Sequence, residues 1–227
     1  MGSSPTGNDS KARVVAPSSH WPDMRALILV ASSKKKDIGS TVGMQATVST
    51  SQLFKIRASE IVPKEMALME KAIQDRDFAT FATVTMRDCN SFHATCLDTS
   101  PPIFYLTDVS RAAVRAVEQI NAATANDKEG GGGPVAAYTF DAGPNAVVYY
   151  LKENEAKVAG VFKEILGEVD GFEKVLPSKE SDIVQGAAAE TLKAGISRVI
   201  MTGVGEGPVK VEEHLIDEHG QAIRSST

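Results

Sequence analysis

The sequence predicts an α+β fold, in which a mainly antiparallel sheet of about four strands is packed on one face by helices. Short runs rich in β-branched and aromatic residues stand near both ends of the chain and in its middle. Long amphipathic segments cluster between these runs instead of alternating with them. An apolar fraction of 42% and a charged fraction of 23% over 227 residues are typical of a globular protein with a sizeable core.

The predicted strands are short apolar runs bounded by turn or polar residues. Residues 25–31 (RALILVA) fit a buried strand, and residues 198–202 (RVIMT) fit a last one. The central stretch 135–150 (VAAYTFDAGPNAVVYY) predicts two strands joined by a tight connection, because Gly, Pro and Asn favour turns. Residues 11–15 predict a further, short edge strand.

The predicted helices are segments in which apolar residues recur at helical spacing. One has Pro63 in its first turn and apolar positions at Val62, Met66, Met69 and Ile73. The next, at residues 78–97, follows Asp77, which can cap it, and ends before a Pro-Pro pair. Further helices are predicted at residues 42–50, 110–122, 156–166 and 187–194.

Three side chains of the 78–97 helix favour a structural interpretation. His93 adjoins the apolar stripe, where a histidine is usually packed with its hydrogen bonds satisfied. Cys89 and Cys96 lie roughly 10 Å apart along the helix axis, which is too far for a disulfide. Reduced thiols, with no Cys/His spacing typical of zinc, favour a cytoplasmic location.

Charge and hydropathy argue against two classes of partner. The net charge of −5 gives no reason to expect nucleic acid or an acidic membrane surface. No apolar run approaches the roughly 20 residues that a membrane helix needs. Neither glycine-rich segment, at 130–133 and 203–208, precedes Gly-Lys-Ser/Thr or a predicted helix, so neither is a phosphate loop.

Two stretches carry candidate chemistry. Asp141 stands at the exit of the first central strand, where a carboxylate can act as a general base or merely cap the turn. Ser40 and Thr41 start a predicted helix, just after a lysine-rich loop that contains Lys35. These hydroxyls can cap the helix, but the same helix end with lysines beside it also attracts phosphate. The residue patterns leave both alternatives open at each stretch.

Four segments resemble one known family. YTFDAGPNA at residues 138–146 resembles the signature of the mevalonate diphosphate decarboxylases, which belong to the GHMP kinase superfamily. Residues 19–32 (SHWPDMRALILVAS), 34–44 (KKKDIGSTVGM) and 90–110 (NSFHATCLDTSPPIFYLTDVS) resemble other parts of the same family, in the same order.

The resemblance spans this chain but only the C-terminal half of the family. It implies the fold of a GHMP kinase C-terminal domain. Residues 1–24 then enter the domain, residues 25–211 form it, and residues 212–227 are a polar tail.

The resemblance also implies a reaction: the ATP-dependent decarboxylation of mevalonate 5-diphosphate to isopentenyl diphosphate, an isoprenoid and sterol precursor. It implies Mg²⁺ as a cofactor and a homodimer as the assembly. At the matching positions Asp141 is the base, while Ser40, Thr41 and Lys35 bind the substrate.

The family's glycine- and serine-rich ATP loop has no counterpart in these residues. We therefore expect the C-terminal part of a longer enzyme, inactive by itself. The alternatives are a catalytically dead module that binds diphosphates or dimerises, and a related mevalonate 3-kinase or phosphomevalonate decarboxylase. An upstream, in-frame ATP loop in the coding sequence separates the enzyme from the dead module.

Overall fold

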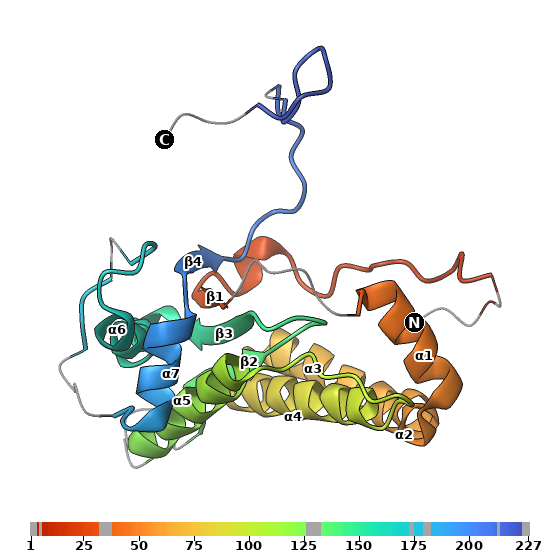
Figure 1. Ribbon diagram of the computed structural model, residues 1–227, viewed down its shortest axis with the longest axis horizontal. Helices are drawn as coiled ribbons and strands as arrows, with labels where there is room; N and C mark the ends of the chain where they lie inside the picture. The colour runs from red at the N-terminus through yellow and green to blue at the C-terminus, as the bar shows by residue number, and fades with distance from the viewer. Residues whose placement is uncertain are drawn as a thin grey trace.

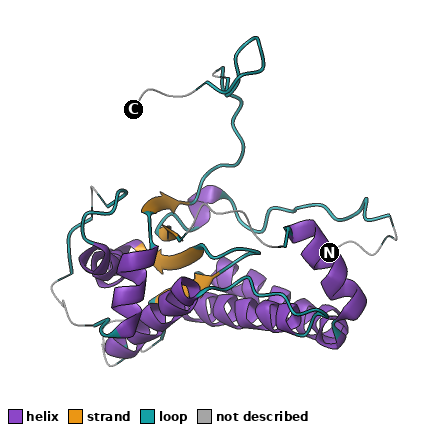
Figure 2. Ribbon diagram, in the orientation of Figure 1, coloured by secondary structure: helices purple, strands orange, loops and turns teal. Residues whose placement is uncertain are grey.

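The computed structural model describes residues 4, 6–31, 38–125, 133–172, 175–178, 183–212 and 214–223. In this part of the chain, four antiparallel strands form one sheet in the order β2-β3-β1-β4, with helices around it (Figures 1 and 2). The strands are β1 (Met24–Val30), β2 (Ala136–Thr139), β3 (Ala146–Leu151) and β4 (Arg198–Gly203). The predicted α+β class is confirmed.

Helices join the strands in two groups. Between β1 and β2 lie α1 (Ser40–Thr50), α2 (Gln52–Ile56), the π-helical turn η2 (Arg57–Ile61), α3 (Val62–Asp75), α4 (Phe78–Leu97) and α5 (Asp108–Thr124). Between β3 and β4 lie α6 (Glu155–Leu166) and α7 (Ala187–Gly195). Short 3-10 turns, η1 (Ser18–His20) and η4 (Lys152–Asn154), precede β1 and α6. The six predicted helices are confirmed, whereas α2 and η2 have no counterpart among the predictions.

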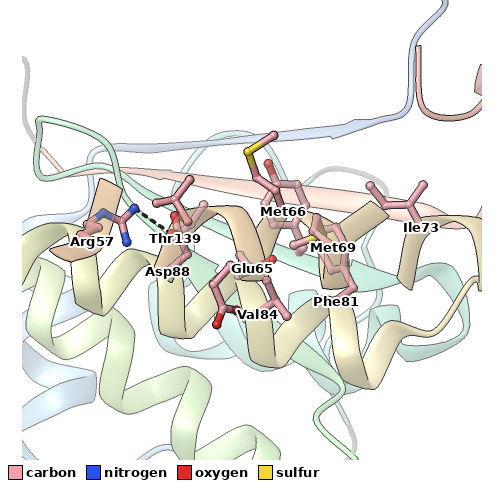
Figure 3. A pocket seen from close by; sticks show the side chains of 12 residues that line it. Arg57, Glu65, Met66, Met69, Ile73, Phe81, Val84, Asp88 and Thr139 are labelled. Carbon is pink, nitrogen blue, oxygen red and sulfur yellow. Dashed lines mark hydrogen bonds and ion pairs between the residues drawn. The ribbon is translucent and has the colours of Figure 1, made fainter. Parts of the chain in front are cut away.

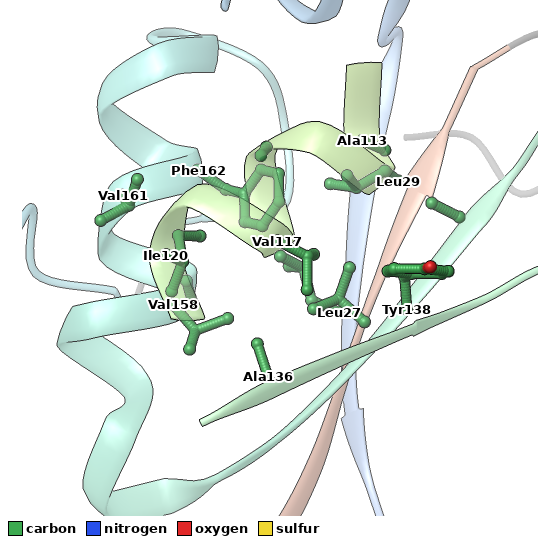
Figure 4. Packing of buried hydrophobic residues seen from close by; sticks show 14 of the residues in the cluster. Leu27, Leu29, Ala113, Val117, Ile120, Ala136, Tyr138, Val158, Val161 and Phe162 are labelled. Atoms are coloured by element: carbon green, nitrogen blue, oxygen red, sulfur yellow. The ribbon is translucent and has the colours of Figure 1, made fainter. Parts of the chain in front are cut away.

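The main core lies against one face of the sheet, because strand side chains alternate between faces. Leu27 and Leu29 of β1 are fully buried on this face. Their partners in register on β3, Val148 and Ala146, join the same cluster. Figure 4 shows how α5 and α6 close this core, with apolar side chains of both helices in the same cluster as those of the strands: Ala113, Val117, Ile120, Val158, Val161 and Phe162.

A smaller aromatic cluster covers the β2–β3 edge on the opposite face of the sheet. Trp21, Phe78 and Ala137 pack together there, and Phe81 meets Tyr149 edge to face at a ring-centroid distance of 5.5 Å. The α3–α4 pair therefore overlaps this second face at one edge of the sheet, as an addition to the helices that cover the main core.

The cap at Asp77 explains where α4 begins. Its carboxylate accepts the Thr80 N–H at 3.0 Å and the Thr80 hydroxyl at 2.6 Å, which satisfies an otherwise free helix amide. These hydrogen bonds hold the pKa of Asp77 below its usual range. Cys89 and Cys96 of the same helix are buried free thiols, as the spacing predicts.

The prediction of a strand at residues 11–15 is wrong. These residues pair with no strand in the described part of the chain, and Val14 is 83% exposed. Arg13 instead forms an ion pair with Glu70 of α3. A strand gains stability by burying one face, and this segment finds no apolar surface to cover. No helix among the described residues could cross a membrane.

Candidate active site

Strand pairing brings the two candidate stretches to one end of the sheet. Because β1 and β3 run antiparallel with Leu29 opposite Ala146, the segment after β1 meets the turn before β3. The Ala31 N–H donates to the Asn145 side-chain oxygen at 3.0 Å across this junction. The loop that leads to α1 therefore starts beside the turn that carries Asp141.

This turn is fixed from a second side by α5. The Ser110 hydroxyl donates to the Pro144 carbonyl at 2.9 Å. Ser110 is itself held in a capping box with Thr107 at the start of α5. Asp141 thus sits on a turn that is bonded to the residue after β1 at one point and to α5 at another, which suits a group that must keep its position.

The Asp141 side chain does not act as the cap of its own turn. The residue is exposed, and its carboxylate accepts no hydrogen bond from the described amides of residues 142–145. An Asx-type turn would require such a bond. The carboxylate is therefore free to interact with a ligand.

The first turn of α1 offers free backbone donors. Its N-cap is Gly39, which has no side chain to cap the helix. The hydrogen-bond ladder begins where the Gly43 N–H donates to the Gly39 carbonyl at 2.9 Å, so the amides of residues 40–42 lie outside the ladder. The positive end of the helix dipole and these amides together favour an anion.

The other end of α1 is anchored to the end of α4. Thr47 and Thr99 share a buried hydrogen bond of 2.9 Å between their hydroxyls. The Ser100 N–H donates to the Thr50 hydroxyl at 2.9 Å, and the Ser51 hydroxyl donates to Asp98 at 2.7 Å. These bonds set the position of α1 relative to α4.

One cavity of about 240 Å³ joins the two candidate stretches. It is lined by Ser40, Gly43, Met44, Phe92, Cys96, Tyr105, Asp141 and Ala142. The structure thus brings Ser40 and Asp141 to the same space. Thr41 is exposed beside it and is not part of the lining, and Lys35 lies outside the described residues. The sequence patterns did not single out Gly43 or Tyr105.

The titratable residues next to Asp141, His93 and Cys96, are neutral. His93 is buried, and this desolvation lowers the pKa of its ring, although the Phe140 backbone and the Asp141 charge act in the opposite direction. Burial raises the pKa of the Cys96 thiol, so Cys96 is a neutral wall of the cavity and not a nucleophile. Among the described residues of this lining, Asp141 is the carboxylate.

A larger cavity, of about 440 Å³, lies between α3, α4 and the second face of the sheet (Figure 3). Its walls are largely apolar, and at one end Arg57 donates to Asp88 at 2.7 Å. None of the predicted site residues that the structure describes lines it, so the smaller cavity is the candidate active site. Among the described residues no group of three or more His, Cys, Asp or Glu could hold a metal ion.

Comparison with known proteins identifies the family of the chain. Residues 26–211 match the family model described as the mevalonate 5-diphosphate decarboxylase C-terminal domain. The chain belongs to the mevalonate 5-diphosphate decarboxylase family. It is 59% identical over 216 residues to a diphosphomevalonate decarboxylase of Gibberella zeae, and 56% identical over 229 residues to one of Aspergillus fumigatus.

Solved decarboxylase structures share the fold. An X-ray structure of mevalonate 5-diphosphate decarboxylase, 43% identical, has a TM-score of 0.81 and covers 97% of this chain. A more distant structure, described as MDDEF in complex with MVAPP, AMPPCP and magnesium, is 28% identical with a TM-score of 0.54, and covers 61% of this chain and 40% of its own.

The chain spans about half the length of these relatives. It covers 55% of each of the two fungal decarboxylases. The alignment includes 95% of this chain for the Gibberella zeae protein and 96% for the Aspergillus fumigatus protein. It also covers 57% of the X-ray structure with the higher TM-score. The family is therefore assigned from this half alone.

Proposed function

We propose that the chain carries the substrate-binding and proton-accepting part of an ATP-dependent mevalonate 5-diphosphate decarboxylase. The observation that carries the proposal is the shared cavity, where Asp141 from the turn before β3 meets Ser40 from the first turn of α1. The family assignment supplies the reaction that these two groups suit.

The chemistry gives each residue a task. The tertiary hydroxyl of mevalonate 5-diphosphate is a poor leaving group until ATP phosphorylates it. Asp141 orients this hydroxyl and accepts its proton as the phosphoryl group is transferred. Loss of the new phosphate together with carbon dioxide then gives the alkene of isopentenyl diphosphate. Positioning of this kind provides much of the rate of phosphoryl transfer.

The anionic end of the substrate is assigned to α1. Ser40 and Thr41 donate hydrogen bonds to it with the free amides of the first turn, and Lys35 adds charge. The MDDEF structure described with MVAPP, AMPPCP and magnesium supports a diphosphate substrate, a nucleotide and Mg²⁺ for the family. The described residues contain no fitting metal cluster, so we assign no Mg²⁺ ligand to them. A cytoplasmic homodimer in isoprenoid and sterol precursor synthesis completes the proposal.

Two rivals are separated by experiment. A mevalonate 3-kinase or phosphomevalonate decarboxylase is disfavoured, because the fungal relatives are diphosphomevalonate decarboxylases at 56% and 59% identity. A catalytically dead module would bind diphosphate without turnover. Product analysis of the complete gene product with ATP and, in separate assays, mevalonate, mevalonate 5-phosphate and mevalonate 5-diphosphate distinguishes these functions, because a dead module turns over none of the three.

The decisive variant is Asp141→Asn in the complete gene product. It keeps the shape of the side chain but removes the basic carboxylate, so turnover should fall by about 10²–10⁴-fold with little change in substrate binding. Steady-state release of phosphate measures this. Asp108→Asn, an exposed carboxylate outside the cavity, is the matched control and should keep normal turnover. If Asp141→Asn retains most of its activity, Asp141 is not the base.

A further inference from the structure

The hydroxyl of Tyr105 is buried and has no hydrogen-bond partner among the described residues. Tyr105 is only 8% exposed and packs in a small cluster with Cys96, Ile103 and Ala142. A buried hydroxyl has lost its contact with water, so an absent partner is unfavourable unless a ligand or another group provides the bond. The position of this hydroxyl therefore calls for an explanation.

The hydroxyl lies directly against the first turns of α1. A Cβ atom built on Gly43 would stand 2.0 Å from the Tyr105 oxygen and 3.2 Å from its ring carbon Cζ. Only glycine admits so close an approach. Tyr105 and Gly43 both line the cavity that contains Ser40 and Asp141. The glycine thus places a phenolic oxygen beside the anion-attracting end of the helix.

The group also has the right chemical character for an anionic ligand. Burial raises the pKa of Tyr105, with a smaller contribution from Cys96, so the phenol stays protonated at neutral pH. A neutral O–H is a donor, and hydrogen bonds to charged oxygens are the stronger kind. The free amides at residues 40–42 present further donors at the same helix end.

We propose that Tyr105 is a substrate-binding residue, whose hydroxyl donates a hydrogen bond to a diphosphate oxygen of the ligand held between Ser40 and Asp141. This inference rests on the proposed function for the identity of the ligand. It adds a third side chain, contributed by the segment between α4 and α5, to a site otherwise built from α1 and the turn before β3.

Tyr105→Phe tests the role because it removes the oxygen and keeps the ring. In the complete gene product, the apparent constant for mevalonate 5-diphosphate should rise about tenfold or more, with little change in the constant for ATP. The melting temperature should stay the same or rise, because an unpartnered buried polar atom is removed. A purely structural hydroxyl would give the stability effect without the kinetic one.

Tyr150→Phe is the matched control. Tyr150 is fully buried and its hydroxyl also lacks a partner in the described part of the chain, but it lies in the main core and not in the cavity lining. Its removal should leave both substrate constants unchanged. Equal constants for wild type and Tyr105→Phe would overturn the proposal.

Calorimetric binding of mevalonate 5-diphosphate separates this inference from the proposed reaction. Suppose that the wild-type protein binds the ligand without turning it over, and that Tyr105→Phe binds it at least about tenfold more weakly. The proposed role of Tyr105 is then supported, and the proposed reaction is contradicted. If turnover depends on Asp141 while both proteins bind the ligand equally, the reaction holds and the role of Tyr105 fails.

Discussion

At the scale of single residues, the neighbourhood of Asp141 shows how burial sets protonation. His93 is 7% exposed, contacts the rings of Phe92 and Phe140 edge on, and has one ring nitrogen, Nε2, without a partner among the described residues. Burial lowers the pKa of this imidazole. A neutral ring behind the turn leaves the Asp141 charge without a fixed counter-ion from His93.

The lowered pKa of His93 predicts a dependence of stability on pH. The unfolded chain binds a proton to this histidine below about pH 6.5, whereas the folded protein does so only at lower pH. The contribution of His93 to the free energy of unfolding is therefore fully present above about pH 6.5. It is lost as the pH falls toward the pKa of His93 in the folded protein. One proton accounts for at most about 1.4 kcal/mol per pH unit.

His93→Asn should flatten this acid dependence, because an amide cannot take up the proton. Urea unfolding between about pH 5 and 7.5 measures the slope for both proteins. His214→Asn, in the exposed tail, should retain the wild-type slope. If the free energy of unfolding has the same slope against pH for His93→Asn and wild type, His93 has the same pKa in the folded and unfolded states.

At the scale of elements, α1 is the part whose position decides the site. Its C-terminal half is bonded to the end of α4, and its first turns rest on Tyr105 through Gly43. The helix buries little apolar surface of its own, since Val42, Met44 and Val48 are each more than half exposed. Its placement therefore depends on a few specific contacts and not on a broad apolar interface.

Gly43→Ala should destabilise the protein although alanine is the better helix former by about 1 kcal/mol. The new methyl group would overlap the Tyr105 oxygen, so the helix or the ring must move. In the double variant Gly43→Ala/Tyr105→Phe the nearest remaining atom is the ring carbon, at 3.2 Å, so much of the loss should be recovered. Thermal melts of the wild type, the two single variants and the double variant complete the double-mutant cycle. Strictly additive changes in melting temperature would contradict the contact between Gly43 and Tyr105.

Ser40→Ala and Thr41→Ala distinguish ligand binding from helix capping. Each hydroxyl bound to a charged oxygen is worth about 1.5–3 kcal/mol, or roughly 10- to 150-fold in the constant for mevalonate 5-diphosphate. We expect the larger effect at Ser40, which lines the cavity, and the smaller at exposed Thr41. The ATP constant should not change.

The stability of the same two variants provides the control. Gly39 is the N-cap of α1, so neither hydroxyl is needed to begin the helix, and both melting temperatures should match the wild type. Loss of a cap costs about 1 kcal/mol. Lower melting temperatures with unchanged substrate constants would show that Ser40 and Thr41 have a purely structural role.

At the scale of the whole molecule, the sequence predicts the helices and strands that have a local apolar pattern. The helix after Asp77 and the strand pair around the Gly-Pro turn each combine a periodic apolar face with a recognisable boundary. Residues 52–61 carry no such face, and the π-helical turn within them has no sequence signature of its own. Residues 11–15 have a strand-like pattern but no surface to bury.

The site was predictable in part for the same reason. A turn, a helix start and a family resemblance make Asp141 and Ser40 candidates, but their proximity depends on the pairing of β1 with β3 and is seen only in the shared cavity. Tyr105 gave no signal, because a tyrosine in an apolar segment looks like a core residue until Gly43 is seen against its hydroxyl. Contacts between distant segments are what sequence patterns leave out.

The central claim is that the cavity shared by Ser40 and Asp141 holds the reacting end of mevalonate 5-diphosphate. The most direct test is a crystal structure of the complete gene product with this substrate bound. The account predicts the tertiary hydroxyl oxygen within about 2.6–3.2 Å of an Asp141 carboxylate oxygen, with the diphosphate at the first turn of α1. A hydroxyl more than about 3.5 Å from Asp141 with no bridging water, or a substrate bound elsewhere, would contradict it.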